Sequence, residues 1–164
     1  MTDHHAPPFD NAKFRQVLGH FPTGVSVVTA ATERGPVGLA VGTFVSVSLE
    51  PALVAFFPNR TSSSWPHIEA TGSFCVNMLA EDQEEVCRRF AEKGDDKFAG
   101  LGWRPARSGS PLLDGVLAWV DCDIEAVSEA GDHFYVLGRV RELDVSREGR
   151  PLVFFRGGYG RFDA

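Results

Sequence analysis

The sequence predicts one mainly β domain, an antiparallel barrel of six or seven strands that is closed or nearly closed and carries two or three short peripheral helices. Three observations predict this class. Apolar stretches of strand length recur along the 164 residues and are separated by short turns rich in glycine and proline. A regular alternation of strands with helices is missing, and so is the Gly-x-Gly-x-x-Gly fingerprint of dinucleotide-binding folds. The 43% hydrophobic and 23% charged content are those of an ordinary globular protein, in which we expect a disordered tail over residues 1–10 and a single domain over residues 11–164.

Composition excludes several kinds of partner and site. The net charge of −6 argues against broad attraction to nucleic acid or to an anionic membrane, and no apolar run is long enough to span a bilayer. The three cysteines, Cys75, Cys87 and Cys122, have no Cys-x-x-Cys spacing. We therefore expect neither a disulfide framework nor a metal site, and the odd count fits a reducing cytoplasm. His4 and His5 are assigned to the tail rather than to a metal site.

The N-terminal part predicts a short amphipathic helix followed by a hairpin. Apolar residues follow the helical spacing i, i+3, i+4 and i+7 at Phe14, Val17, Leu18 and Phe21. Asp10 or Asn11 is available as the helix cap. Residues 25–31 then predict a strand, residues 33–36 a hairpin turn, and residues 37–45 a second strand.

The middle of the chain predicts two strands and two helices. Residues 52–57 are apolar throughout, as in a strand that is covered on both faces, and residues 73–79 form the next strand. Between them, hydroxyl residues can cap a short helix that Gly72 closes. Val86 and Phe90 mark the apolar side of a second helix with an acidic start.

The C-terminal part begins with a long excursion and ends in strands. Glycine, proline and charge dominate residues 93–111, which we interpret as a surface loop. Residues 116–127 alternate apolar with acidic side chains, which predicts a half-buried strand with its acidic residues on the solvent face. A turn leads into a second long strand over residues 133–143, so the pair forms a hairpin. Residues 151–155 are the last strand, before an irregular tail.

Two neighbouring stretches suggest a planar, phosphorylated ligand. Between Val37 and Pro51, small residues and hydroxyls alternate with β-branched ones, as in a strand whose backbone comes close to something flat. Between Asn59 and Trp65, a cluster of hydroxyls runs into the predicted helix, where unpaired backbone N–H groups can hold a phosphate.

The order of motifs along the chain resembles the short-chain flavin reductase family, the small reductase components of two-component flavin monooxygenases. The motifs that carry the resemblance are Phe21-Pro-Thr-Gly-Val-Ser-Val-Val-Thr29, Thr43-Phe-Val-Ser-Val-Ser-Leu-Glu-Pro51, Phe74-Cys-Val-Asn-Met-Leu79, Asp96-Lys-Phe98, Gly131-Asp-His133, Gly138-Arg-Val140 and Pro151-Leu-Val-Phe-Phe-Arg-Gly-Gly-Tyr159. They span nearly the whole chain, from about Phe14 to Tyr159. Two positions depart from the common pattern, because Gly42 stands where serine is frequent and Ala52 replaces a second proline.

The resemblance implies a flavin-binding split barrel of Greek-key type that forms a homodimer. It further implies that NADH or NADPH reduces FMN or FAD by hydride transfer to flavin N5, and that the reduced flavin diffuses to a separate monooxygenase. The two cofactors carry this chemistry themselves, so the protein needs no Ser-His-Asp arrangement or carboxylate pair.

The resemblance also implies the residues of the site. The isoalloxazine ring is expected to contact Thr43, Phe44, Val45, Ser46, Val47 and Ser48. The flavin phosphate is expected to contact Arg60, Ser62, Ser63 and Ser64. Lys97 and Phe98 are expected to close over the flavin, and His133 to act as the catalytic residue beside the nicotinamide.

For three further candidate residues, two roles each remain possible. Asn59 holds the loop or touches the ribityl chain, and Tyr159 covers the nicotinamide or packs at the dimer interface. Cys75 belongs to a family motif and is counted with the flavin contacts, although its residue type favours a small core residue.

Two other functions compete with a flavin reductase. A split barrel can bind and carry a flavin without reducing it, because a fold does not fix a function. An oxidase of a phosphorylated pyridine is the third reading, and it needs several basic residues that converge on a second phosphate. Only Arg60, Lys97, Arg139 and Arg156 are available for that role in the stretches assigned to the site, so this reading ranks last.

Overall fold

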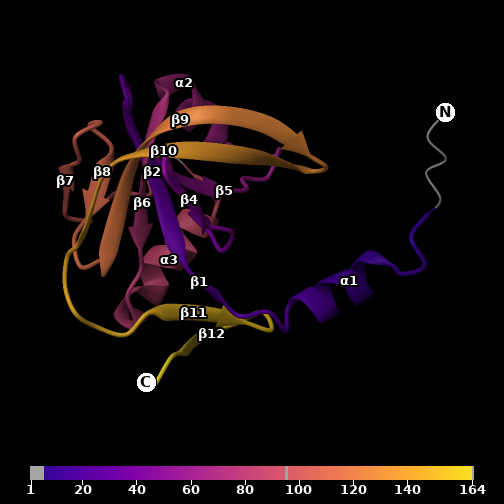
Figure 1. The fold of residues 1–164 in the computed structure, drawn as a ribbon. Helices are drawn as coiled ribbons and strands as arrows, with labels where there is room; N and C mark the ends of the chain where they lie inside the picture. Colours follow the sequence, from indigo (N-terminus) through magenta and orange to yellow (C-terminus); the bar gives the residue numbers. More distant parts are fainter. Residues whose placement is uncertain (1–5, 95, 164) are drawn as a thin grey trace.

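A seven-stranded antiparallel sheet forms the centre of the structure, a computed structural model that describes residues 6–94 and 96–163 (Figure 1). In spatial order its strands are β3 (Gly35–Val41), β2 (Ser26–Thr32), β6 (Ser73–Met78), β9 (Ala118–Ala130), β10 (His133–Val145), β5 (Ala52–Phe56) and β4 (Val45–Leu49). The predicted mainly β class with six or seven strands is confirmed. Strands β3 and β4 are the two edges, each paired along one side only. Residues 1–5 of the expected tail, with His4 and His5, lie outside the described residues.

The predicted strand over residues 37–45 is wrong in its extent, because the chain leaves it at Val41. The Thr43 hydroxyl accepts the backbone N–H of Phe57 at 3.1 Å and so fixes a bend after Gly42. Strand β4 then begins at Val45 on the opposite edge of the sheet. The chain therefore crosses from one sheet edge to the other within a few residues, and this bend borders the candidate site.

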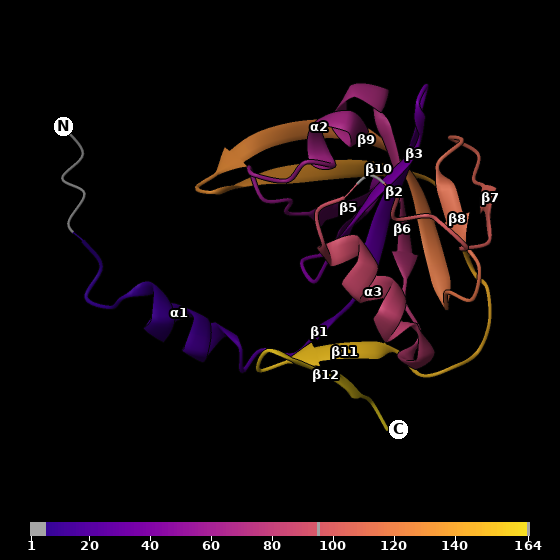
Figure 2. The same cartoon turned by 180° about the vertical axis from the view of Figure 1, so that it is seen from behind.

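Three α-helices occur in the described residues, at the predicted places. They are α1 (Asn11–Leu18), α2 (Trp65–Thr71) and α3 (Glu84–Ala91), the last preceded by a 3₁₀ turn over Glu81–Gln83. The Asp10 carboxylate caps α1 by accepting the N–H of Lys13 at 2.8 Å, and Gly72 ends α2 with a φ of 75°. Helices α2 and α3 pack on strands β2 and β3 (Figure 2), whereas α1 buries none of its residues and stands apart from the sheet in both views (Figures 1 and 2).

Two smaller sheets correct the expectation of loops. The irregular tail predicted after residue 155 contains β12 (Gly158–Arg161), which pairs with β11 (Leu152–Phe155), and β11 in turn pairs with β1 (Thr23–Gly24). The turn at Arg156 and Gly157, whose φ angles are 51° and 77°, reverses the chain.

The expected surface loop over residues 93–111 is also partly ordered as strand. It contains β7 (Trp103–Pro105), which pairs with β8 (Pro111–Leu113). The carbonyl of Pro111 accepts the Thr29 hydroxyl at 2.5 Å and the Asn77 amide at 3.2 Å. These contacts attach the segment to the main sheet. The glycine and proline content of the segment predicts a loop, and it cannot reveal contacts with distant strands.

The hydrophobic core lies on both faces of β6. Phe74 and Val76 point into one cluster, where Phe74 and Phe56 rings lie edge to face at 4.9 Å, and Cys75 points into the other. Gly138 on β10 permits this packing, because a Cβ there would lie 2.5 Å from Phe74 Cζ.

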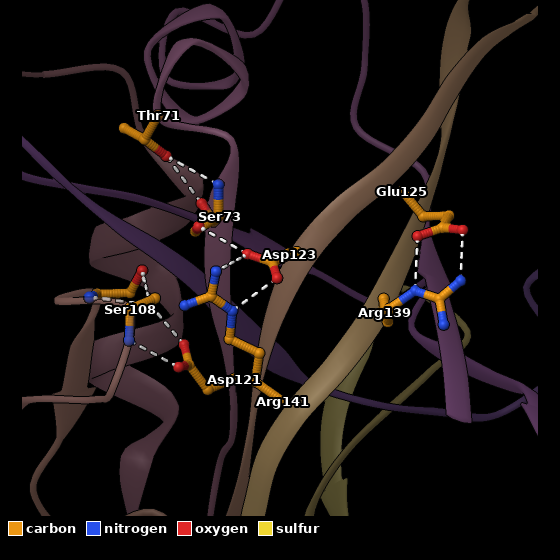
Figure 3. A network of polar contacts seen from close by, with 9 residues as sticks. Thr71, Ser73, Ser108, Asp121, Asp123, Glu125, Arg139 and Arg141 are labelled. Carbon is orange, nitrogen blue, oxygen red and sulfur yellow. Dashed lines mark hydrogen bonds and ion pairs between the residues drawn. The ribbon is translucent and has the colours of Figure 1, made fainter. Parts of the chain in front are cut away.

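The alternation along β9 predicts the wrong environment for Asp121, which is fully buried. Ser108 covers it, and its backbone N–H and hydroxyl donate to the two carboxylate oxygens at 2.8 and 2.6 Å (Figure 3). Asp123 and Glu125 do lie toward solvent, as predicted, and they pair with arginines of β10. The segment before β8 therefore folds over the first half of β9 and leaves the second half uncovered.

Candidate functional site

A groove of about 360 Å³ follows the edge strand β3 and the bend after it; we call it the β3 groove. Besides Phe90 and Ala91 at the end of α3, its lining residues are Leu39, Ala40, Val41, Gly42, Thr43, Phe57, Pro58, Asn59, Thr61, Ser62, Ser63, Ser64, Glu92, Lys93, Lys97 and His133. They come from the edge strand, the bend, the loop before α2, the segment after α3 and the start of β10. Segments far apart in the sequence thus meet at one place.

The floor of the β3 groove is made of small side chains on an edge strand. Leu39 and Val41 are buried, and Ala40 and Gly42 add little bulk. Because β3 pairs only with β2, the backbone groups on its outer side have no ladder partner. A flat ligand can therefore approach this backbone and form hydrogen bonds with it.

The hydroxyl-rich loop before α2 divides into residues that hold the loop and residues that face the cavity. Asn59 Oδ1 accepts the N–H and the hydroxyl of Thr61, both at 2.8 Å, so Asn59 holds the loop. Ser62 Oγ accepts the N–H groups of Ser64 at 3.3 Å and Trp65 at 3.2 Å, and so satisfies two backbone donors at the start of α2. Ser63 forms no side-chain hydrogen bond within the described residues, and its hydroxyl is left for a ligand.

Lys97 supplies a positive charge to the groove from the side of α3. Its ammonium lies 3.4 Å from the Ser64 hydroxyl and the Gly38 carbonyl, and 3.3 Å from the Phe90 carbonyl. Within the described residues no carboxylate pairs with it. Burial lowers the pKa of Lys97, because the ammonium has lost water without gaining a counter-charge.

His133 lines the groove at the first residue of β10. A backbone bridge joins it to Asn59, and its Nδ1 lies 2.7 Å from Asp132 Oδ1. The hydrogen bond and charge of His133 lower the pKa of Asp132. Since Asp132 engages Nδ1, Nε2 is the nitrogen left to meet a ligand.

The structure brings seven of the predicted site residues into the β3 groove. They are Thr43, Asn59, Ser62, Ser63, Ser64, Lys97 and His133. Sequence reasoning carried over from the family did not name Leu39, Ala40, Val41, Phe57, Pro58 or Lys93, which also line it. The alternation of small and β-branched residues predicted a strand that approaches a flat ligand. That strand corresponds to β3, which forms the floor of the groove.

The other predicted residues lie outside this lining. Val45, Ser46, Val47 and Ser48 are on β4, and Phe44 packs partly buried against the core. Cys75 is fully buried in the core, where burial raises the pKa of its thiol.

Arg60, Phe98 and Tyr159 do not line the β3 groove. Arg60 pairs with Glu129 at 3.2 Å, and Phe98 packs edge to face on Phe90 at 4.9 Å. The Tyr159 hydroxyl lies 3.3 Å from Cys87 Sγ, beside a smaller apolar cavity of about 220 Å³ that shares Ala40, Val41 and Gly42 with the groove.

Residues 6–94 and 96–163 contain neither a metal-binding cluster nor a membrane-spanning helix. No group of three or more His, Cys, Asp or Glu side chains there is arranged to hold a metal ion. No described helix has the length and apolar character needed to cross a membrane.

Comparisons with known proteins agree on one family. The family model of the flavin reductase like domain matches residues 18–163. A flavin reductase of Pseudomonas putida is 57% identical over 152 residues, which cover 92% of this chain and 89% of that protein. The reductase subunit HsaB of a flavin-dependent monooxygenase from Rhodococcus jostii is 49% identical, over 94% of this chain and 79% of the subunit.

A solved structure agrees with this match. It is that of the NADH:FAD oxidoreductase SgcE6 of Streptomyces globisporus C-1027, in complex with NAD and FAD fragments. The two chains superimpose with a TM-score of 0.87 and are 35% identical, over 94% of this chain and 93% of that one.

Proposed function

The chain belongs to the family of flavin reductase-like domains, and we propose that its β3 groove is the site of flavin reduction. The protein is a flavin reductase that uses NADH to reduce a flavin and supplies the reduced flavin to a separate monooxygenase component. The choice between FMN and FAD, the use of NADPH in place of NADH, and the residues that carry the reaction belong to the proposal.

One observation carries the assignment of the site: the β3 groove joins a flat, small-residue floor to a cationic, hydroxyl-lined end. The isoalloxazine ring lies against Leu39 to Thr43, where the edge strand offers unpaired backbone groups. The flavin phosphate lies at Ser63, Ser64 and Lys97. A partly buried ammonium without a carboxylate partner in the described residues, beside a free hydroxyl, fits an anionic phosphate.

The protein's contribution to the reaction is to hold and orient the reactants. The bound flavin and nicotinamide supply the hydride transfer from nicotinamide C4 to flavin N5. The edge N–H groups of β3 donate hydrogen bonds to the ring, and Lys97 neutralises the phosphate. His133, with Nδ1 held by Asp132, contacts the nicotinamide in the groove.

Anaerobic mixing of the protein with excess flavin and nicotinamide tests this function. Nicotinamide absorbance and flavin absorbance are followed together, with FMN or FAD and with NADH or NADPH. Multiple turnovers of free flavin are expected with NADH. Flavin binding without loss of flavin absorbance would contradict the proposal and favour a flavin carrier.

His133 has its own expected outcome. His133→Ala raises the nicotinamide KM or slows hydride transfer at least about tenfold, because one positioned polar contact is lost. Flavin affinity stays within about twofold. The matched control is His20→Ala, since His20 lies beyond α1 and outside the β3 groove, with its ring near the Gln16 carbonyl and the Phe155 ring. Unchanged kinetics in the His133 variant would remove its catalytic assignment.

The ion pairs argue against an oxidase of a phosphorylated pyridine, because they occupy arginines that a second phosphate would need. Arg60 pairs with Glu129, and Arg139 forms a two-pronged contact with Glu125 at 2.8 and 2.7 Å. Of the four basic residues considered for a second phosphate, only Lys97 lines the β3 groove.

The proposal includes a homodimer that works in the cytoplasm. Helix α1 carries Phe14, Val17 and Leu18, and Phe21 follows it; these four side chains are between 51% and 72% exposed. A second copy of this chain is the partner that the family resemblance implies for such an apolar helix face. All three cysteines are free and buried thiols, which is consistent with a reducing compartment.

A further inference from the structure

A second cavity lies next to the β3 groove, beyond a wall formed by Ser63, Ser64 and Lys97. These three residues line both cavities. The second cavity has a volume of about 410 Å³ and follows the first half of β3 and the turn before it, from Thr32 to Gly38. We call it the Arg34 cavity. Both volumes lie within the range of ~300–1,000 Å³ that is typical of small-molecule sites.

The charge of the Arg34 cavity is opposite to that of the whole protein. Arg34, His67 and Lys97 line it, and none of the described residues in its lining is acidic, although the chain has a net charge of −6. Arg34 and His67 are exposed, and their side chains form no hydrogen bond or ion pair within residues 6–94 and 96–163. Such a local excess of positive charge suits an anionic group of a ligand.

The remaining lining offers a surface for a flat ring. Pro36, Val37 and Phe98 contribute apolar contacts. Phe98 is held in place by edge-to-face contacts with Phe90 and Trp103, with ring centroids at 4.9 and 6.3 Å. The cavity therefore combines a group of basic side chains with the packed aromatic ring of Phe98.

We propose that the Arg34 cavity holds the adenosine monophosphate half of FAD, and that Arg34 and His67 make the enzyme prefer FAD to FMN. This inference rests on the proposed function, because the flavin phosphate must lie at the shared wall of Ser63, Ser64 and Lys97. From that wall the second phosphate of FAD enters the Arg34 cavity, where Arg34 and His67 contact it. The adenine lies against the apolar part. FMN ends at the wall and leaves the Arg34 cavity unused.

Nicotinamide dinucleotides also contain an adenosine monophosphate half, so the experiment must separate the two sources. The shared wall favours the flavin, because the group bound in the β3 groove continues directly into the Arg34 cavity. If the nicotinamide dinucleotide is the occupant instead, changes at Arg34 alter its affinity and leave that of FAD unchanged.

Isothermal titration of the full-length protein with FAD, FMN and NADH tests the proposal without relying on turnover. The variants are Arg34→Gln and His67→Gln, and the matched control is Arg107→Gln, an exposed arginine outside both cavities. We expect the unmodified protein to bind FAD about tenfold more tightly than FMN. Arg34→Gln weakens FAD binding about tenfold, the loss of one charge-assisted contact, and changes FMN and NADH binding less than twofold. His67→Gln acts in the same direction with a smaller effect, and the control changes nothing.

Three results would overturn the inference. The first is equal affinity of the unmodified protein for FAD and FMN. The second is an equal loss for both flavins in Arg34→Gln, and the third is a loss for NADH alone. A preference for FAD without anaerobic turnover would instead contradict the proposed function and leave the inference standing, whereas turnover without a preference for FAD would contradict the inference alone.

Discussion

Single residues in the hydroxyl-rich loop have separable roles, although the sequence presents them as one cluster. Ser62 satisfies the backbone at the start of α2, whereas Ser63 makes no such contact in the described residues and faces both cavities. The sequence predicted the cluster as a whole, because hydroxyl residues before a helix are recognisable. It could not divide the roles, since both residues are serines and only the path of the loop tells them apart.

Paired substitutions should separate these roles. Ser62→Ala is expected to lower the free energy of unfolding by about 0.5–1.5 kcal/mol, because it removes the hydrogen bonds to two N–H groups at the start of α2. Ser63→Ala should leave stability within about 0.5 kcal/mol and weaken flavin binding instead. Urea denaturation and flavin titration of both variants check this. Equal effects of the two variants on flavin affinity would contradict the division.

Lys97 should reduce stability while it improves ligand binding. Its pKa is lowered in the folded protein because burial disfavours the charged form. The folded state therefore binds the proton less tightly than the unfolded state, and the penalty is fully present below the lowered pKa. It disappears as the pH rises through the ordinary lysine value of about 10.4.

Lys97→Met is therefore expected to raise the melting temperature at pH 7 and to lose that advantage at higher pH. The same variant should weaken FMN binding at least about tenfold and leave riboflavin, which has no phosphate, unaffected. Thermal unfolding at several pH values and titration with the two flavins check both parts. Lys13→Met on α1 is the control. A parallel loss of riboflavin binding would mean that Lys97 contacts the ring instead of the phosphate.

At the scale of elements, the β9–β10 hairpin is joined by ion pairs where it lies open to solvent. Arg141 Nε donates to Asp123 Oδ2 at 2.6 Å, and Ser73 donates to the same carboxylate at 3.3 Å (Figure 3). The hydrogen bond from Arg141 is the main cause that lowers the pKa of Asp123. Because the pKa is lower in the folded state, this pair stabilises the protein above the ordinary aspartate value of about 3.9 and loses its effect as the pH falls below it.

Arg141→Gln should thus lower the free energy of unfolding at pH 7 only slightly, since the pair is partly exposed. The difference from the unmodified protein should shrink toward zero near pH 2. Urea midpoints at the two pH values measure it, with Arg107→Gln as the control. A difference that does not depend on pH would show that lost packing of the arginine side chain, and not the ion pair, causes it.

Sequence patterns predicted the helices but missed features that depend on contacts between distant segments. Helical spacing and caps located α1, α2 and α3, because these signals are local. The bend that separates β3 from β4 was missed, since it depends on a hydrogen bond between Thr43 and Phe57, which are distant in the sequence. Burial of Asp121 was missed for the same reason, because Ser108 covers it from another segment. The groove floor was predicted as a strand near a flat ligand, but its exact residues depend on that bend.

At the scale of the whole molecule, the monomer leaves a large apolar surface uncovered. The α1 face described above stands away from the sheet (Figures 1 and 2), and β4 adds Val45, Val47 and Leu49, which are also exposed. Two copies could cover each other's surfaces, as the expected homodimer requires.

Replacing Phe14 and Val17 by serine should therefore dissociate the dimer into monomers. Fully burying side chains of this size stabilises an interface by roughly 1.5–3 kcal/mol each, so the dissociation constant should rise at least about tenfold. Light scattering across a concentration series measures it, with Leu143→Ser, an exposed apolar residue on β10, as the control. A monomeric unmodified protein, or a variant that remains dimeric, would contradict the assignment of α1 to the interface.

The position of the flavin is tested most directly by the crystal structure of the protein soaked with FAD. We expect electron density for the isoalloxazine ring against Leu39 to Thr43, with the first phosphate between Ser63, Ser64 and Lys97. Density for the ring on the outer face of β4, against Val45 to Ser48, would contradict it.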